Sequence, residues 1–196
     1  MADCTLTILD GLDPSCEAIK KQGGLNKRIW IGNFDEIVTT DDADGYIDSV
    51  VMSGSPTPTL FQFEGRDFKH NYTIEGVIGE NLNTLNPTLN LVLYYFTPQE
   101  RAAIEGLFNA EKLVAFVQGN GGDTKAVIEI FGLLNGLKAS ALTGGSGTIL
   151  NDTTALTVSL LGEETELPKV LKSGSLNPIQ AGYLQENIDY LDAISV

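Results

Sequence analysis

Histidine, cysteine and tryptophan are scarce in this chain of 196 residues, which has one histidine, two cysteines and one tryptophan. The single histidine, His70, excludes a zinc site built from several histidines, and the spacing of Cys4 and Cys16 fits no metal-binding pattern. A Ser-His-Asp triad would need His70, but no G-x-S-x-G motif accompanies it. We therefore interpret His70 as a structural side chain on the apolar face of a strand. The sequence predicts a protein that is not an enzyme and has no cofactor and no metal site.

Basic residues are also few, with 12 lysines and arginines against 26 acidic residues and a net charge of −14. Such a surface repels phosphate, so we expect no specific binding of nucleic acid through a basic patch. No apolar run approaches the ~20 residues that cross a bilayer. The N-terminus lacks the basic and then apolar order of a secretory signal, so we expect synthesis in a cytoplasm and no membrane association. The two cysteines are either reduced thiols or a disulfide that closes the N-terminal segment.

One acidic segment comes close to a calcium-binding loop but does not fit it. The segment TTDDADGYID can be aligned on Gly45 as the glycine of an EF-hand loop. Thr40 and Val51 then occupy the first and last ligand positions, where carboxylates are required. The glycine-rich loops have no P-loop pattern either, because each leads into a strand.

Alternation of apolar and polar residues, the period of a β-strand, dominates from Tyr46 onward. A hairpin is predicted over residues 60–78, in which Phe61 and Phe63 share a face of the first strand and His70 lies on the apolar face of the return strand. Further strands are predicted at residues 28–34, 46–52, 88–96, 112–118, 125–131, 137–141 and 154–162. The strands at 112–118 and 125–131 are predicted to form a hairpin, and the NG pair at 135–136 marks another turn. In the last strand, alternation points Val158 and Leu160 inward and Thr157 and Ser159 outward.

One helix is predicted at residues 98–113. Thr97 and Glu100 form a capping box, and Pro98 occupies the first helical position, where its missing N–H costs nothing. An apolar stripe at helical spacing predicts packing on the sheet. The stripe consists of Ala103, Ile104, Leu107 and Phe108.

These elements predict a mainly β domain, sandwich-like or barrel-like, with one packed α-helix, extended loops and terminal arms. Residues 1–45 form an N-terminal lead with the first strand, and residues 46–167 form the β-rich core. Residues 168–196 have mixed composition, compatible with a short helix near Gln185 to Asp192, and we expect an arm that becomes ordered against a partner.

Residues 125–171 resemble the closing portion of the tail tube (major tail) proteins of long-tailed bacteriophages. The shared features are a strand, a short glycine turn, a Gly/Ser-rich loop, an LND step, an alternating strand and a G-E-E end. The resemblance implies subunits that form hexameric rings, with stacked rings making a hollow tube that conducts DNA during ejection. It implies a location in the virion tail, assembly in the bacterial host cytoplasm, and no catalytic residue.

The same resemblance implies that the partners are copies of the chain and other phage tail proteins. DNA passes without specific binding, because a negative wall does not hold phosphates. The glycine-rich loop at 143–152 either becomes ordered on a neighbouring subunit or is a plain surface loop. The candidate inter-subunit contacts are Lys20, Lys21, Lys27, Arg28, Trp30, Gly144, Gly145, Ser146 and Gly147.

Two other interpretations stay open. One is a different structural protein of the virion, such as a head decoration or tail-completion protein. The other is a carbohydrate-binding or adhesion β-sandwich, in which Trp30, Tyr94 and Tyr95 form a platform that stacks on sugars.

Overall fold

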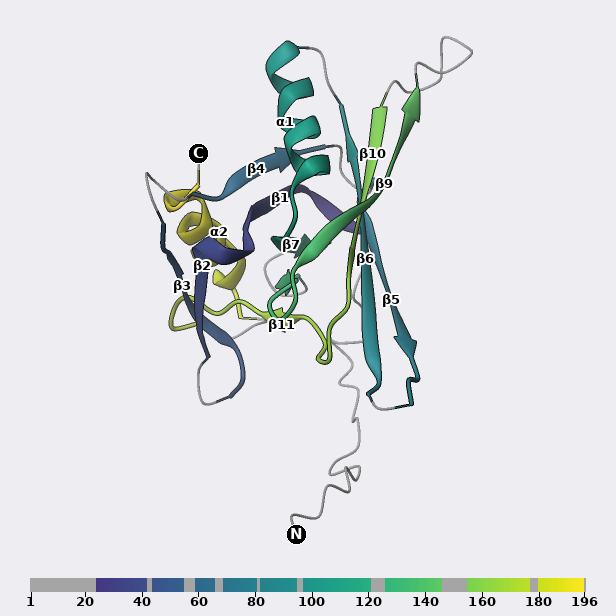
Figure 1. The fold of residues 1–196 in the computed structure, drawn as a ribbon. Helices are drawn as coiled ribbons and strands as arrows, with labels where there is room; N and C mark the ends of the chain where they lie inside the picture. Colours follow the sequence, from purple (N-terminus) through teal and green to yellow (C-terminus); the bar gives the residue numbers. More distant parts are fainter. Residues whose placement is uncertain are drawn as a thin grey trace.

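The computed structural model describes residues 24–41, 44–54, 59–65, 69–80, 82–94, 97–120, 126–145, 155–176 and 180–195. In these residues the protein is mainly β, with two antiparallel sheets and two α-helices (Figure 1). The mainly β prediction is confirmed; one helix is the predicted packed helix after Thr97, and the other coincides with the short helix expected near Gln185 to Asp192.

The large sheet contains β1 (Leu25–Asn33), β4 (Phe61–Glu64), β5 (Asn71–Val77), β6 (Thr84–Leu93), β7 (Leu113–Gly119), β8 (Ile128–Phe131), β9 (Leu137–Gly145), β10 (Ala155–Gly162) and β11 (Lys169–Val170). The small sheet contains β2 (Ile37–Asp41) and β3 (Ile47–Met52). The helices are a 3-10 turn at Phe34–Glu36, α1 (Pro98–Asn109) and α2 (Tyr183–Ala193).

The large sheet consists of two halves. One half has the order β4-β1-β7-β8-β11, and the other has the order β9-β10-β6-β5. The halves join where Leu113 of β7 pairs with Leu137 of β9, and where Gly65 forms a bridge with Leu93 at the end of β6. We refer to the second half as the four-stranded half.

A first hydrophobic core fills the space between the two halves. It takes buried side chains from β1, β6, β7, β8, β9 and β10, and Ile104 and Leu107 of α1 complete it. The capping box is present: the Glu100 N–H donates to Thr97 Oγ1 at 3.2 Å, and the Thr97 N–H donates to Glu100 Oε2 at 2.8 Å. The helix ends at Asn109, before the predicted residue 113, and Phe108 stays 39% exposed.

A second core covers the opposite face of the β1-β7-β8 layer. Its outer wall consists of α2 and β3, which contribute buried side chains such as Leu191 and Val50. Strand β7 is therefore central, and all six residues from Leu113 to Gln118 are buried. Alternate residues of β7 point to opposite faces, so Ala115 belongs to the first core and Phe116 to the second.

The C-terminal segment, predicted to be an arm, is part of this second core. Tyr183 and Leu191 of α2 are fully buried, and the Tyr183 hydroxyl donates to the Leu171 carbonyl. The Tyr190 hydroxyl donates to the Val50 carbonyl and accepts from the Val50 N–H, each at 2.8 Å. In the described residues the segment packs on its own chain, because its apolar side chains recur at helical spacing and cover β1, β7 and β8.

The predicted hairpin over residues 60–78 is wrong in its pairing. Strand β4 pairs with β1, where Phe63 faces Ile29, and β5 pairs with β6, where Tyr72 faces Leu89. Local alternation defines strands but does not choose their partners, and here β1 is the available neighbour of β4. The predicted hairpin of β7 and β8 and the turn at Gly136 are confirmed.

Candidate self-assembly interface

The four-stranded half has two open edges in the described residues. Strand β5 pairs with β6 alone, and β9 pairs along its length with β10 and meets β7 only at Leu137. In Figure 1 these strands stand on the side of the molecule opposite α2 and the β2–β3 hairpin. Open edges present unpaired N–H and C=O groups to another chain. Because all pairings in this half are antiparallel, β5 runs opposite to β9.

A row of hydrogen-bonded polar side chains crosses all four strands on the face away from the core. Asn90 Nδ2 on β6 donates to Asn71 Oδ1 on β5 at 3.0 Å. Ser159 Oγ on β10 donates to Asn90 Oδ1 at 2.7 Å, and Ser140 Oγ on β9 donates to the Ser159 carbonyl at 3.1 Å. The row links the four strands through side chains as well as backbone.

The rest of this face is nearly uncharged, with threonines and the exposed apolar side chains of Leu161 and Val77. Strand alternation places Thr73, Thr88 and Thr157 on it, opposite the neighbours that enter the core. Among the described residues of the four strands, only Glu75 and Lys138 bring charge to it. The excess of carboxylates therefore lies outside this face of the described strands.

Two predicted basic contacts pair with acids of their own chain. Lys27 Nζ lies 2.6 Å from Glu64 Oε1, and Arg28 Nη1 lies 3.4 Å from Asp192 Oδ2. The hydrogen bond from Lys27 lowers the pKa of the Glu64 carboxyl despite the opposing effect of burial. All four side chains are substantially exposed, so these pairs contribute little to stability. Their side chains still reach the surface.

Trp30 is the clearest correction among the predicted contacts. Its side chain is fully buried, and its Nε1 donates to Asp192 Oδ1 on α2 at 3.0 Å. It stabilises the docking of α2, so no face of its ring is open to a neighbouring subunit or to a sugar. The stacking platform with Tyr94 therefore does not form, and Tyr95 lies outside the described residues.

Gly144 and Gly145 belong to the regular part of β9 and not to a loop. Neither has a positive φ, so the expected conformational role of glycine does not apply here. A Cβ on Gly144 would lie 2.3 Å from the Ala155 carbonyl oxygen, whereas Gly145 has open space. Gly144 thus permits close approach of β10. Lys20, Lys21, Ser146 and Gly147 lie outside the described residues.

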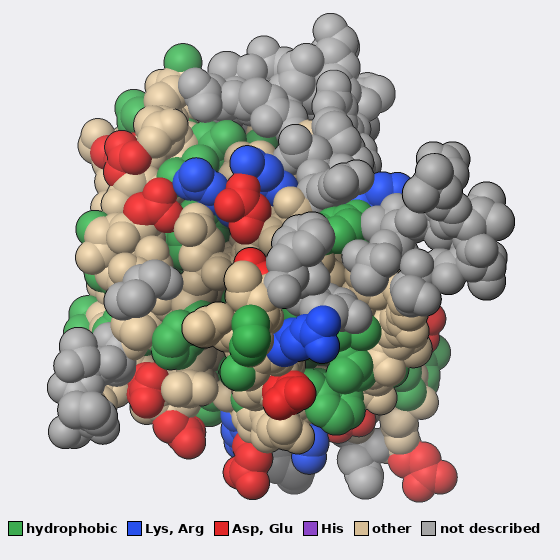
Figure 2. Space-filling model, turned by 90° about the horizontal axis from the view of Figure 1, so that it is seen from above, with side chains coloured by type: hydrophobic (Ala, Val, Ile, Leu, Met, Phe, Trp, Pro, Cys, Tyr) green, Lys and Arg blue, Asp and Glu red, His purple; other side chains and the backbone are tan. Residues whose placement is uncertain are grey.

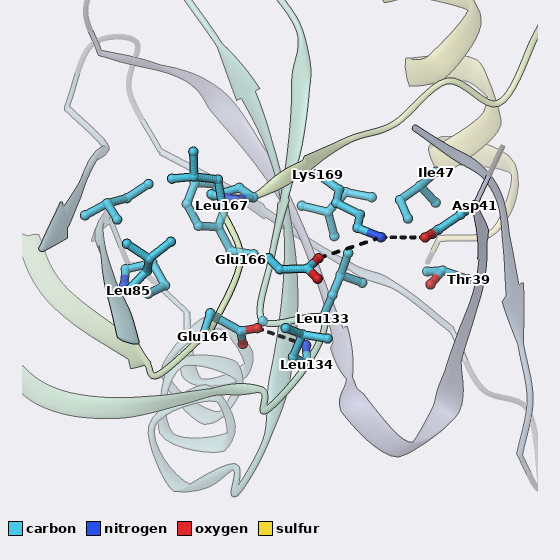
Figure 3. A pocket seen from close by; sticks show the side chains of 16 residues that line it. Thr39, Asp41, Ile47, Leu85, Leu133, Leu134, Glu164, Glu166, Leu167 and Lys169 are labelled. Carbon is cyan, nitrogen blue, oxygen red and sulfur yellow. Dashed lines mark hydrogen bonds and ion pairs between the residues drawn. The ribbon is translucent and has the colours of Figure 1, made fainter. Parts of the chain in front are cut away.

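A cavity of about 220 Å³ lies between the β5–β6 pair, the end of β8 and β11 (Figure 3). Its walls are largely apolar, with Leu85 and Leu133 among them. Lys169 Nζ lies 2.5 Å from Asp41 Oδ2 and 4.0 Å from Glu166 Oε2. Since these charged groups pair with one another, the cavity presents no separate acid and base in the described residues that line it.

Glu164 lines the same cavity, but its carboxylate is hydrogen-bonded to backbone N–H groups. Its carboxylate accepts the N–H groups of Leu134 at 3.0 Å and Asn135 at 3.2 Å, next to the turn at Gly136. Burial raises the pKa of the Glu164 carboxyl, while these backbone donors act in the opposite direction. The sequence did not indicate that Glu164 is buried, because an acidic residue that follows a strand is usually exposed and its partners lie about 30 positions earlier in the chain.

The described residues contain neither a metal-binding cluster nor a broad basic surface. Figure 2 shows acidic and basic side chains next to one another on the face at the top of Figure 1, without a broad basic field. No group of three or more His, Cys, Asp or Glu side chains could hold a metal ion within the described ranges. The helices described there are too short or too polar to cross a bilayer.

No protein-family model and no curated protein sequence matches this chain.

Proposed function

We propose that this chain is a structural virion protein that assembles into stacked, hexameric rings, which form the tail tube of a bacteriophage and conduct DNA during ejection. The observation that carries the proposal is the pair of open edges on the four-stranded half. Strand β5 of one copy can join β9 of the next, and the two strands meet antiparallel because they run in opposite directions within one subunit. Each copy thereby closes the edge of its neighbour.

Head-to-tail pairing of two different edges is a heterologous contact, which closes into a ring when the rotation between copies divides the circle. The core face of the four-stranded half is covered by β1, β7, α1 and, behind them, α2. These covering elements take up space, and a ring offers more space at its outer circumference than at its inner one. The uncovered face, with the row from Asn71 to Ser140, would then surround the passage.

A neutral wall suits a passing polyanion. The face has hydroxyl and amide groups, with Glu75 and Lys138 as its charges in the described residues. Binding of DNA depends on several cationic contacts with phosphates, and each contact adds to affinity and salt dependence. With so few charges, the wall would let DNA slide without specific binding.

The first test is assembly of the full chain. Negative-stain electron microscopy of concentrated protein should show rings or tubes, and sedimentation velocity should show mass increasing with concentration. A strict monomer at high concentration, with no rings when other tail proteins are added, would contradict the proposal.

The second test identifies the edges. Two single-cysteine variants, Thr73→Cys on β5 and Ala141→Cys on β9, are made in a background with Cys4→Ser and Cys16→Ser. Mixed and treated with a short bismaleimide, the two proteins should give a cross-linked heterodimer, which only an intermolecular contact can produce. A mixture of Thr73→Cys with Val38→Cys is the matched control, because Val38 is 52% exposed and belongs to the separate two-stranded sheet, which has neither of the two edges. Equal yields in the two mixtures would argue against the edge contact.

A further inference from the structure

His70 lies at the junction of the two halves of the large sheet. Its side chain is 1% exposed, and its Nδ1 accepts the N–H of Val92 on β6 at 3.0 Å. Its carbonyl accepts the N–H of Leu25 on β1 at 3.3 Å. Directly beside it, Gly65 at the end of β4 forms a bridge with Leu93 of β6. One residue thus connects the β1–β4 layer with the β5–β6 pair.

The Val92 hydrogen bond fixes the protonation state of the ring. Because Nδ1 accepts a hydrogen bond, it carries no proton, and the hydrogen of the neutral imidazole is on Nε2. Nε2 has no hydrogen-bond partner among the described residues. A second proton on Nδ1 would face the Val92 N–H, which removes this bond and leaves a cation in a buried site. Burial lowers the pKa of the His70 imidazole, and the backbone of Lys27 opposes this more weakly.

Within the described residues, no carboxylate forms a hydrogen bond or ion pair with the His70 ring. The described titratable or charged side chains on the adjoining strands and turns are Lys27, Arg28, Glu64, Lys69, Tyr72 and Glu75. Glu64 is engaged with Lys27 at 2.6 Å, and Arg28 reaches toward α2. Lys69 is exposed, and β6 contributes no charged residue. Glu75 lies five positions farther along β5, on the face away from the core, so the described residues place no free carboxylate beside the ring.

The ring also has no room to turn away. A Cβ on Gly65 would lie 2.4 Å from His70 Nε2 and 2.6 Å from the Val92 carbonyl oxygen, so the imidazole rests directly on the glycine backbone. A protonated ring must leave this site to gain water. We propose that His70 is an acid-sensitive latch, which holds the β5–β6 pair against β1 and β4 when neutral and releases it when protonated.

The direction of the effect follows from linkage. The folded protein holds the proton of His70 less readily than the unfolded chain does, so the unfolded or opened state binds more protons in acid. The latch stabilises the junction fully above the ordinary histidine pKa of about 6.5 and loses this contribution as the pH falls below it. This inference does not depend on the proposed function, since it concerns one subunit.

A single histidine makes the first test direct. Using the untagged full chain, the Hε1 resonance of His70 is followed by NMR as the pH is lowered. We expect the folded resonance to persist below pH ~6.5 and the titration to accompany opening of the junction. Titration of the folded protein at or above that value, with its fold unchanged, would overturn the proposal.

Hydrogen exchange mass spectrometry, corrected for the intrinsic pH dependence of exchange, locates the opening. Between about pH 7 and pH 5, exchange at Val92 and in the adjoining peptides of β1 and β5 should rise by up to about tenfold per pH unit, while α2 stays protected. His70→Asn is the control, because its amide oxygen can accept from Val92 and cannot be protonated. Equal acid-induced exchange in this variant and the wild type would refute the latch. Should the variant not fold, the NMR titration of the wild type decides alone.

Discussion

Replacing Leu191 by alanine tests whether the C-terminal segment belongs to the core. Leu191 is fully buried in the second core, whereas Leu167, before β11, is 64% exposed. Deleting buried leucine atoms costs about 2–5 kcal/mol, because transfer free energy is lost and a cavity remains. The same substitution at an exposed position costs within about 0.5 kcal/mol. For a chain of this length, the difference corresponds to a fall in Tm of roughly 4–20 °C for Leu191→Ala.

Trp30 provides the assay. It is the only tryptophan, and its Nε1 hydrogen bond to Asp192 reports the docking of α2. Urea unfolding followed by its fluorescence gives the midpoint and slope for the wild type, Leu191→Ala and Leu167→Ala. The slope should be unchanged, so that the shift in midpoint reports stability. Equal midpoints for the two alanine variants would refute the structure of this region, since an arm that orders only on a partner would give that result.

Three further predictions concern single hydrogen-bonding groups. Asp192→Ala leaves the buried Trp30 N–H without its acceptor, so we expect a loss of about 1–3 kcal/mol, measured by urea unfolding. Because burial raises the pKa of Glu164, its folded form holds a proton more readily than its unfolded form; the stability of the wild type relative to Glu164→Gln should therefore decrease as the pH rises from about 4 toward 7, as thermal unfolding would show. Thr97→Ala removes the acceptor for the Glu100 N–H at the start of α1, and calorimetry should show a loss of about 1 kcal/mol.

Local features of the sequence were enough to predict several helices and strands. The capping box at Thr97 determined where α1 begins, because its hydrogen bonds join residues three positions apart. The alternation in β10 predicted that Val158 and Leu160 enter the core, with Thr157 and Ser159 on the other face. Strand alternation and helix capping depend on residues a few positions apart, so they can be recognised without knowing which strands pair.

Long-range pairing was not readable in this way. The pattern of residues 60–78 is compatible with a hairpin, but β4 pairs with β1, which lies about 30 residues earlier in the chain. Alternation does not indicate which distant strand is the partner. The same limit applies to Trp30, whose partner Asp192 is 162 positions away. The open edges of β5 and β9 depend on which strands the whole sheet leaves unpaired, so the candidate interface required the fold.

Strand β7 is buried on both faces, so the stability of each core depends on the other. A substitution that loosens the packing beneath α2 also disturbs a strand whose next residue supports the packing beneath α1. A substitution in either core should therefore lower the free energy of unfolding of both. If this chain builds a long tube, damage to the outer, helix-covered side of one repeat would also weaken the sheet side of the same repeat.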